Sequence, residues 1–485
     1  MVMEKLVPFN PSRIRGHIPQ LYRQGIMWGL LILLVVVNGC SPQARPIQLH
    51  SENSHYFLWR GEPALLITSG EHYGAVLNRA FDYDTYLQTL HSHGFNLTRT
   101  FSGAYCESAG AFRIRDNTLA PAEGDLLCPW KRSDVPGYPE GGNTFDLTQW
   151  DPRYFSRLRD FVATADRQGV VVELVLFCPF YRDSMWDLSP MNAKNNVNGI
   201  GDLDRTDVYT LKDQPLTRTQ DRMVEKIVTE LNGFGNLYYE ICNEPYFGGV
   251  TLKWQRHIAD VIVRNEEQLG TRHLIAQNIA NGSARITAPN PAVDIFNFHY
   301  AKPPTAVTVN YHLGKAIADD ETGFSGSEPK PYRLEGWDFI LAGGGVFDNL
   351  DYSYTVGHED GTAEIQAPGG GGPVFRHQLE ILRNFITGFN FINMAPDSTL
   401  ILNALPDSIT VRALAEEGAA YALYVKGNGL RQLQVRMPDG MYLAEWVNTK
   451  TGRIDKSETV RPEQGSLVLD TPEYRDDIAL KILYQ

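Results

Sequence analysis

A glutamate that directly follows a buried strand is the first candidate for chemistry in this sequence. Residues 237–242 are apolar enough for a buried parallel strand, and they are followed by Asn243, Glu244 and Pro245. Because Pro245 cannot continue a strand ladder, Glu244 is expected where the strand opens into a loop. In a barrel of parallel strands, that end carries the catalytic side chains. Taken alone, the motif also fits a solvated glutamate at an ordinary turn.

A second carboxylate stands in the same kind of place. Residues 316–319 predict another short strand, which finishes in Asp320 and Glu321 before Gly323. Glycoside hydrolysis needs two carboxyl groups at one bond, since one protonates the leaving oxygen and the other attacks the sugar or activates water. Glu244 and Glu321 are far apart in the sequence. They can meet only in a fold that brings their strands together, such as a (β/α)8 barrel.

Over residues 55–395 the chain resembles the retaining glycoside hydrolases of clan A, the group that includes the family 5 cellulases and mannanases. In that clan an Asn-Glu pair ends strand 4, with the glutamate as acid/base, and a second glutamate ends strand 7 as the nucleophile. Asn243, Glu244 and Glu321 match these positions. Each motif is weak alone, but four motifs in the expected order make the combination specific.

Two further segments complete the resemblance. Residues 96–101 are similar to the clan's strand 2, in which Arg99 takes the place of an arginine that supports the nucleophile. Residues 296–300 are similar to the strand 6 region, in which His299 and Tyr300 take the place of cleft residues. The resemblance implies that the arginine holds the nucleophile ionised and that the asparagine of the Asn-Glu pair binds the sugar 2-hydroxyl. It also implies that the histidine and the tyrosine orient the site.

The match departs from the family pattern in two places. Thr322 stands where an aromatic residue usually follows the nucleophile, and acids precede Glu321, so Asp320 stays the alternative nucleophile. The tryptophan that many members carry after strand 8 is missing from residues 346–354, where Tyr352 is the candidate sugar contact. A weaker resemblance to apiosidase-like lipoproteins, which join such a barrel to a small C-terminal β-domain, leaves family 5 itself open.

The implied mechanism is double displacement on an extracellular poly- or oligosaccharide. Glu321 attacks the anomeric carbon while Glu244 protonates the departing oxygen, and Glu244 then activates the water that releases the sugar. No cofactor is required, and the sequence contains no metal-ligand pattern. One alternative is a non-catalytic glycan-binding lipoprotein on a barrel scaffold. Another is a metal-dependent barrel hydrolase, which would need paired histidines after strand 1, where His72 is alone.

Loops after two of the predicted strands offer further substrate contacts. Glu71 and His72 directly follow strand 1 and are expected at the rim. The loop at residues 181–201 carries Trp186, which is suited to stacking on a sugar, and asparagines such as Asn192, which are suited to binding hydroxyl groups. The alternative for the asparagines is a loop held by its own Asx turns.

The remaining sequence supplies the alternating elements of such a barrel. Short apolar runs predict eight strands, at residues 64–68, 96–101, 170–177, 237–242, 274–277, 294–298, 316–319 and 345–349. Helices are expected between them, and Asp151 with Pro152 marks the clearest helix start, with Gly169 as its end. The fold class is therefore α/β, a (β/α)8 TIM barrel over residues 55–395.

Beyond the barrel the pattern changes to short alternating segments separated by Gly, Pro and Asp turns. Residues 396–485 are therefore expected to form a small all-β sandwich. Its role, in binding glycan or in supporting the barrel, stays open. With 485 residues, of which 43% are hydrophobic, the chain is long enough for both domains. A net charge of −13 disfavours nucleic acid as a partner, whereas a neutral carbohydrate fits.

The N-terminus predicts export. Arginines precede an apolar run at residues 26–37, which has the length of a signal-peptide core, and residues 37–40 resemble a bacterial lipobox with Cys40 as the lipidated residue. We expect a signal peptide over residues 1–40, a linker over residues 41–54, and a lipid anchor in the cell membrane or outer membrane. The alternatives are an uncleaved membrane anchor and an ordinary signal peptide of a secreted or periplasmic protein.

Four cysteines remain after the lipobox. Cys106 and Cys128 fall in the long segment after strand 2, and an exported location permits a disulfide that would close this loop. Cys178 and Cys242 end strands 3 and 4, where buried free thiols are expected.

Overall fold

The computed structural model describes residues 45–366 and 368–485, which belong to one compact unit. The predicted signal peptide, the lipobox and its Cys40 lie outside the described residues. Among the residues described, no helix combines the length and the apolar character needed to cross a membrane.

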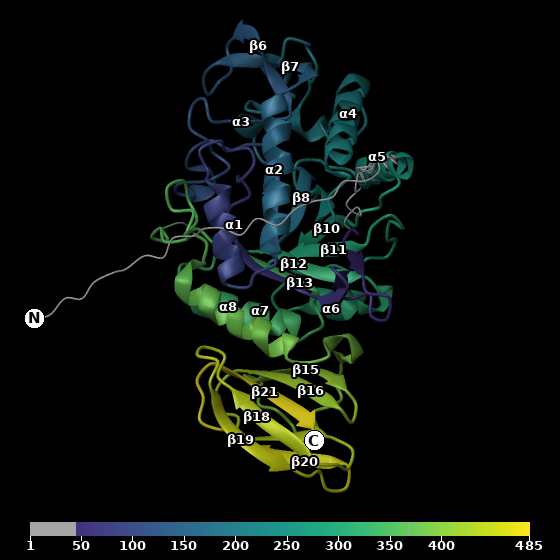
Figure 1. Ribbon diagram of the computed structural model, residues 1–485, viewed down its shortest axis with the longest axis vertical. Helices are drawn as coiled ribbons and strands as arrows, with labels where there is room; N and C mark the ends of the chain where they lie inside the picture. The colour runs from purple at the N-terminus through teal and green to yellow at the C-terminus, as the bar shows by residue number, and fades with distance from the viewer. Residues whose placement is uncertain (1–44, 367) are drawn as a thin grey trace, which may run out of the picture. The chain divides into compact units, whose positions relative to one another are not determined.

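Eight parallel strands form a nearly closed barrel, which confirms the predicted fold class (Figure 1). Around the sheet the strands are β4 (Leu66–Gly70), β13 (Val346–Leu350), β12 (Ala316–Thr322), β11 (Ile295–His299), β10 (Ile275–Asn281), β9 (Leu237–Cys242), β8 (Val171–Phe177) and β5 (Leu97–Phe101). The side chain of Asn96 links the two end strands. It accepts a hydrogen bond from Ile67 N at 3.0 Å and donates one to Leu65 O at 2.9 Å.

Helices between the strands pack on the outside of the barrel (Figure 1). They are α1 (Tyr83–Ser92), α2 (Pro152–Gln168), α4 (Gln214–Leu231), α5 (Leu252–Leu269), α6 (Thr305–Asn310), α7 (Pro329–Ile340) and α8 (Gly372–Thr387). Helix α2 begins and ends where the sequence predicts. Asp151 accepts a hydrogen bond from Arg153 N at 2.9 Å, and Gly169 ends the helix with a φ of 71°, which favours glycine.

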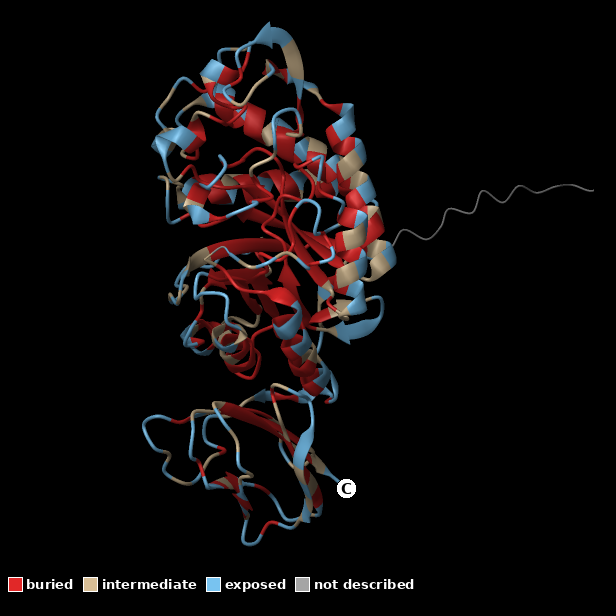
Figure 2. Ribbon diagram, turned by 90° about the vertical axis from the view of Figure 1, so that its left-hand side faces the viewer, coloured by how far each residue is buried: buried red, intermediate tan, exposed pale blue. Residues whose placement is uncertain are grey.

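The barrel strands are buried on both faces, as the red strands in Figure 2 show. Their interior side chains change character along the barrel. At the N-terminal end they are apolar, as at Leu97 and Val171, and Phe57 of β2 (Phe57–Trp59) packs against them. Two residues further along the same strands, the interior side chains are Arg99 and Glu173. The charged layer therefore lies directly beneath the C-terminal rim.

Strand boundaries differ from the predicted ones mainly at the start of the barrel. Strand β4 begins two residues later than expected, because β3 (Glu62–Ala64) pairs with β2 in a small antiparallel sheet. That sheet also contains β1 (Gln48–Leu49), within the segment that we expected to be a linker. Elsewhere β10 and β12 extend a few residues beyond their predicted ends.

The C-terminal region is an antiparallel β-domain, as expected. One sheet has the order β14 (Ala395–Pro396), β15 (Thr410–Glu416), β16 (Ala420–Lys426), β21 (Asp477–Tyr484), β18 (Tyr442–Val447) and β19 (Ile454–Val460), and a second pairs β17 (Gln432–Arg436) with β20 (Ser466–Asp470). Trp446 lies in its core. Helix α7 contacts the first sheet through Arg333, which binds Asp477, and through Trp337, whose ring stacks on Tyr424 at 5.5 Å.

The long segment after β5 is more ordered than the sequence indicates. It contains a 3₁₀ turn at Ala111–Arg113 and the hairpin β6 (Trp130–Pro136) and β7 (Asn143–Trp150). The disulfide that the sequence permits between Cys106 and Cys128 is not formed. Both residues are free thiols, and both are buried. Each sulfur has another partner: Cys106 lies 3.7 Å from the Tyr138 hydroxyl, and Cys128 donates to Trp130 O at 3.4 Å.

Candidate active site

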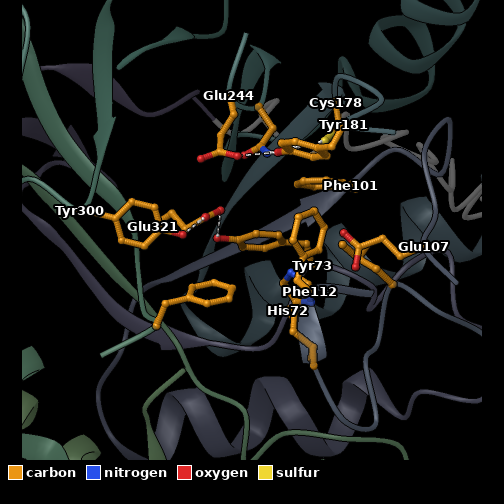
Figure 3. Close-up of a pocket in the computed structure, with 14 residues that line it drawn as sticks. His72, Tyr73, Phe101, Glu107, Phe112, Cys178, Tyr181, Glu244, Tyr300 and Glu321 are labelled. Carbon is orange, nitrogen blue, oxygen red and sulfur yellow. Dashed lines mark hydrogen bonds between the residues drawn. The ribbon is translucent and has the colours of Figure 1, made fainter. Parts of the chain in front are cut away.

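The two candidate acids meet at the C-terminal end of the barrel strands. Glu244 lies two residues after β9, and Glu321 is the second-last residue of β12. An oxygen of Glu244, an oxygen of Glu321 and a ring nitrogen of His299 all lie within 4.8 Å of one another. Figure 3 shows both carboxyl groups on the wall of one pocket.

Glu321 reaches this pocket because β12 is irregular near its end. In a regular strand, adjacent side chains point to opposite faces, so Asp320 and Glu321 could not both face the barrel interior. The pairing with β11 skips one residue, since Asp319 pairs with Phe298 and Glu321 with His299. This bulge lets Asp320 point into the charged layer while Glu321 faces the pocket.

Four donors surround the Glu321 carboxylate. The Tyr300 hydroxyl donates to Oε1 at 2.7 Å, while the Tyr73 hydroxyl and Arg99 Nη1 donate to Oε2 at 3.0 and 3.3 Å. His299 Nδ1 lies 3.5 Å from Oε1. Burial alone would raise the pKa of Glu321, but His299, Arg99 and Tyr300 outweigh it and hold the pKa well below its ordinary value. Glu321 is therefore ionised at neutral pH.

Glu244 has a different set of partners. The Tyr181 hydroxyl donates to Oε2 at 2.6 Å, and the Tyr246 hydroxyl donates to Oε1 at 3.2 Å. The amide of Asn243 donates to the Tyr181 hydroxyl at 2.9 Å, so this tyrosine links the Asn-Glu pair. Within residues 45–366 and 368–485, no arginine or lysine contacts Glu244. Its side chain is fixed by hydroxyl groups and by His299.

His299 lies between the acids. Its Nδ1 is 3.3 Å from Glu244 Oε1, and its Nε2 is 3.5 Å from Asp320 Oδ1. Burial opposes a charge on this ring, but the carboxylates of Glu321, Glu244 and Asp320 outweigh it and raise the pKa of His299 well above its ordinary value. The imidazolium has donors at both nitrogens and can bind all three acids.

Arg99 supports the site from below. Its guanidinium donates to Glu240 Oε2 at 2.6 and 2.9 Å and to Asn243 Oδ1 at 2.7 Å, in addition to its bond to Glu321. Asp320 and Glu173 lie 3.8 and 4.0 Å from the same group. Arg99 therefore orients the Asn-Glu pair and the second acid together, whereas Asp320 lies beneath the pocket and does not line it.

Aromatic rings make up much of the pocket wall. The pocket is lined by His72, Tyr73, Phe101, Glu107, Phe112, Ile114, Leu119, Cys178, Tyr181, Asn243, Glu244, Tyr300, Glu321 and Phe324. Five of these residues, none of them glycine, have a positive φ between 35° and 60°: Tyr73, Phe112, Glu244, Tyr300 and Phe324. Backbone strain of this kind gathers at functional sites because the surrounding fold must hold it in place.

Of the predicted contacts after strand 1, one lies at the pocket. His72 lines it and hydrogen-bonds Asn117 Oδ1 at 2.8 Å. Glu71 instead turns away and accepts hydrogen bonds from Gly74 N and Ala75 N, each at 3.0 Å. Burial raises the pKa of Glu71 to about 7. Glu71 thus shapes the turn that carries Tyr73.

The structure places the predicted sugar contacts in the loop after β8 outside the pocket. Trp186 is 5% exposed, and its indole nitrogen donates to Leu203 O at 3.0 Å. Asn192 accepts a hydrogen bond from Lys194 N, as in an Asx turn, and its amide donates to Trp186 O. Neither side chain lines the pocket. The loop uses these groups to fold upon itself, which is the alternative that the sequence left open.

Tyr352 lies behind the pocket wall. Its ring packs against His72 and Phe324, with centroids 5.7 and 6.4 Å away, and 5% of the residue is exposed. It is not among the lining residues, so the sugar contact that the sequence predicted there is indirect at most.

Two groups of side chains could present ligands to a metal ion: Glu244, His299 and Glu321 in the pocket, and Glu173, Glu240 and Asp320 beneath it. Each group already contains or surrounds a cationic side chain, His299 in the first and Arg99 in the second. A cationic side chain of the protein is therefore already present at both places.

Several groups at the site escaped the sequence analysis. Tyr73 and Tyr181 contact the two acids but lie in loops without a motif. Glu173 and Glu240 gave a signal that was not used: each interrupts an apolar strand with a charge. A buried strand tolerates a charged side chain only where a group of opposite charge lies close to it, and here that group is Arg99.

Solved structures with a similar fold include proteins described as glycoside hydrolases. One from Bacteroides vulgatus ATCC 8482, provisionally described as a glycoside hydrolase, is 15% identical with a TM-score of 0.65, over 92% of this chain and 83% of that chain. A family 5 glycoside hydrolase from the same strain is 13% identical with a TM-score of 0.60, over 90% and 93%. No protein-family model and no curated protein matches the chain. The chain therefore shares the barrel and C-terminal β-domain fold of glycoside hydrolases.

Proposed function

We propose that this protein is a retaining glycoside hydrolase that cleaves O-glycosidic bonds of an extracellular poly- or oligosaccharide. The observation that carries the proposal is the closeness of the two acids, since one oxygen of Glu244 lies within 4.8 Å of one oxygen of Glu321. Retaining enzymes place their carboxyl groups about 5–5.5 Å apart, whereas inverting enzymes need about 6.5–9.5 Å to admit a water. The fold shared with glycoside hydrolases supports the same assignment.

In the first step, Glu321 attacks the anomeric carbon and Glu244 gives its proton to the departing oxygen. The low pKa of Glu321 keeps it ionised for the attack. Glu321 loses its negative charge when it forms the ester bond. The hydroxyls of Tyr73 and Tyr300 stay in place to donate hydrogen bonds to the carboxylate when it forms again. In the second step, Glu244 takes a proton from water, which attacks the same carbon as its bond to the Glu321 oxygen breaks. The sugar leaves with its original configuration, and Glu321 is again a carboxylate.

Arg99 and His299 act as positioning groups for this cycle. Arg99 binds Asn243 and Glu321 at once, so it sets the distance between the Asn-Glu pair and the nucleophile. His299 contacts an oxygen of each acid and carries the charge that favours ionised Glu321. The amide of Asn243 is engaged by Tyr181, so a sugar 2-hydroxyl would share or replace that bond.

Hydrolysis of a panel of 2,4-dinitrophenyl glycosides tests the proposal. Hydrolysis of at least one of these glycosides is expected. The 2-deoxy-2-fluoro analogue of that glycoside should leave a covalent adduct, which a peptide map should place on Glu321. An adduct on Asp320 would move the nucleophile by one residue. Binding of glycans without turnover of any substrate would support the non-catalytic glycan-binding alternative instead.

We also propose that the protein is exported and held at a membrane by a lipid on Cys40. The support is the lipobox-like segment at residues 37–40. Cys40→Ser should release the protein from membrane fractions. Continued retention of this variant would indicate an uncleaved anchor.

A further inference from the structure

We propose that the active site is a blind pocket for a single sugar residue, in which Glu107 binds hydroxyl groups of the non-reducing end, so that the enzyme removes terminal residues from a chain. This inference rests on the proposed glycosidase function and specifies the substrate end on which it acts. It uses a buried carboxylate for which the mechanism has no role.

The side of the pocket away from the acids is closed by the segment after β5. Phe112, Ile114 and Leu119 line the pocket, and the last two are 1% exposed. The Phe112 ring packs edge-on against Tyr181 at 5.2 Å, which ties this segment to the wall that holds Glu244. A chain of sugars that entered between the acids could not continue past this wall.

A second hollow lies on the other side of the wall. It has an empty volume of about 1420 Å³ and is lined by residues such as Asn78, Asp116 and Asn117. Asn117 separates the two hollows, since its side chain binds His72 and Glu107 of the catalytic pocket. The polar trio formed by His72, Glu107 and Asn117 is therefore the blind end.

The lining of the catalytic pocket agrees with a sugar residue as its ligand. Aromatic walls with a few polar groups suit a pyranose ring, which offers an apolar face and hydroxyl edges.

Glu107 is the polar group best placed to read the far hydroxyls. It is 3% exposed and lines the same pocket as the two acids (Figure 3). Tyr105 donates to its Oε1 at 3.0 Å and Asn117 donates to its Oε2 at 2.6 Å. Each oxygen keeps capacity for another donor, so adjacent hydroxyls of one sugar can bind the fixed carboxylate.

The opposite side, next to Glu244, is open. Tyr246 and Phe247 follow the Asn-Glu pair and are 38% and 42% exposed. Their rings pack together at 5.0 Å, and the Tyr246 hydroxyl contacts Glu244. Glu244 protonates the leaving oxygen, so the rest of the chain extends over these exposed rings.

The first experiment uses 4-nitrophenyl β-glucoside, β-mannoside, β-galactoside and β-xyloside, together with the four corresponding β-1,4-linked tetrasaccharides. For the preferred sugar, the tetrasaccharide should release monosaccharide and trisaccharide in equal amounts as its only early products. The same tetrasaccharide with a 4-O-benzyl group on its non-reducing residue should be inert. Early disaccharide, or cleavage of the benzylated chain, would overturn the blind pocket.

Aryl monoglycosides separate this inference from the function on which it rests. Turnover of an aryl glycoside together with internal cleavage of tetrasaccharides would leave a glycosidase with an open cleft. Absence of turnover on all aryl glycosides and tetrasaccharides would overturn the proposed function and this inference with it.

The second experiment tests Glu107 directly. Glu107→Gln keeps the shape but removes the charge, and it should lower kcat/KM for the preferred aryl glycoside about 10- to 100-fold. On the deoxy analogue that lacks the contacted hydroxyl, at C3, C4 or C6, the variant and the wild type should differ by less than about threefold. An equal loss on every analogue would indicate general damage and would contradict a hydroxyl contact.

Glu266→Gln is the matched control. Glu266 is 2% exposed, lies on α5, and pairs with His273 away from the pocket. Its loss removes a buried carboxylate without touching the pocket, so the ratio of activities between the full sugar and its deoxy analogues should equal that of the wild type. A changed ratio in this control would remove the specificity argument for Glu107.

Discussion

Two buried arginines in this molecule have contrasting surroundings. Arg99, inside the barrel, has four carboxylates within 4.0 Å, with Glu240 at 2.6 Å and Glu321 at 3.3 Å. Arg333, where α7 meets the C-terminal β-domain, binds one carboxylate, that of Asp477, at 2.8 Å. A single buried pair is balanced and holds structure together. An excess of buried acids around one cation lowers the stability of the fold. Such a cluster is typical of sites where the charge has a function.

The pKa values of several of these acids are shifted. Burial, reinforced by the charges of Asp320 and Glu240, raises the pKa of Glu173 well above its ordinary value. Burial likewise raises the pKa of Asp348 beside this layer. Glu321, in contrast, has its pKa lowered because His299 and Arg99 face it. The barrel interior therefore concentrates its available positive charge on the nucleophile, whereas burial disfavours ionisation of Glu173 and Asp348.

The largest effect is expected at the Arg99 site. Glu321→Ala removes the proposed nucleophile, and loss of a nucleophile lowers kcat by a factor on the order of 10⁶ in a hydrolase. Added azide should restore turnover of a dinitrophenyl glycoside by attacking from the vacated face, giving a glycosyl azide of inverted configuration. NMR of the azide product is the measurement. Azide rescue in Asp320→Ala but not in Glu321→Ala would reverse the assignment.

Glu244→Gln should have the next largest effect, and it should depend on the leaving group. General acid catalysis contributes roughly 10²–10⁴-fold, so turnover of substrates with poor leaving groups should fall by that factor. A dinitrophenolate needs little protonation, and its glycoside should retain much more activity in glycosylation. Comparison of kcat/KM for dinitrophenyl and methyl glycosides measures this. Equal losses on both would remove Glu244 from the acid role.

The Arg333 pair should show the opposite behaviour. Asp477→Ala leaves a buried guanidinium without its carboxylate, which typically costs about 3–5 kcal/mol of stability. We expect a lower denaturation midpoint in urea but a kcat/KM within about threefold of the wild type in native buffer. A large loss of activity in folded protein would show that the two arginine sites are coupled and would break the comparison.

The smallest effect is a change in pH dependence. His299→Gln removes a cation beside Glu321, and without it the carboxyl ionises less readily, so the pKa of Glu321 rises. The acid limb of the kcat/KM profile reports the essential base of the free enzyme and should move to higher pH. An acid limb that stays in place, or moves to lower pH, would show that His299 does not control Glu321.

The sequence predicted the barrel and the two acids because both depend on local signals. Eight apolar runs marked the strands, and Pro245 marked the end of one of them. Glu244 and Glu321 then followed from the geometry of parallel strands, whose C-terminal ends share one rim. The bulge in β12 gave no signal, since skipping Asp320 depends on pairing with β11.

The sequence did not predict which partners the loop side chains would contact. Trp186 and Asn192 are the residue types of a sugar site, yet their loop buries them in its own contacts. Tyr73 and Tyr181 carried no motif and nevertheless bind the two acids. Composition of a loop indicates what it can bind, but its direction is set by packing that only the folded chain reveals.

The stereochemistry of the wild-type reaction tests the central claim most directly. If Glu244 and Glu321 act as a closely spaced pair, no water fits between the nucleophile and the anomeric carbon, and two inversions occur in succession. An early proton NMR time course, recorded before mutarotation, should show the first sugar product with the anomeric configuration of its substrate. A first product of inverted configuration would contradict the double displacement and the roles given to both acids.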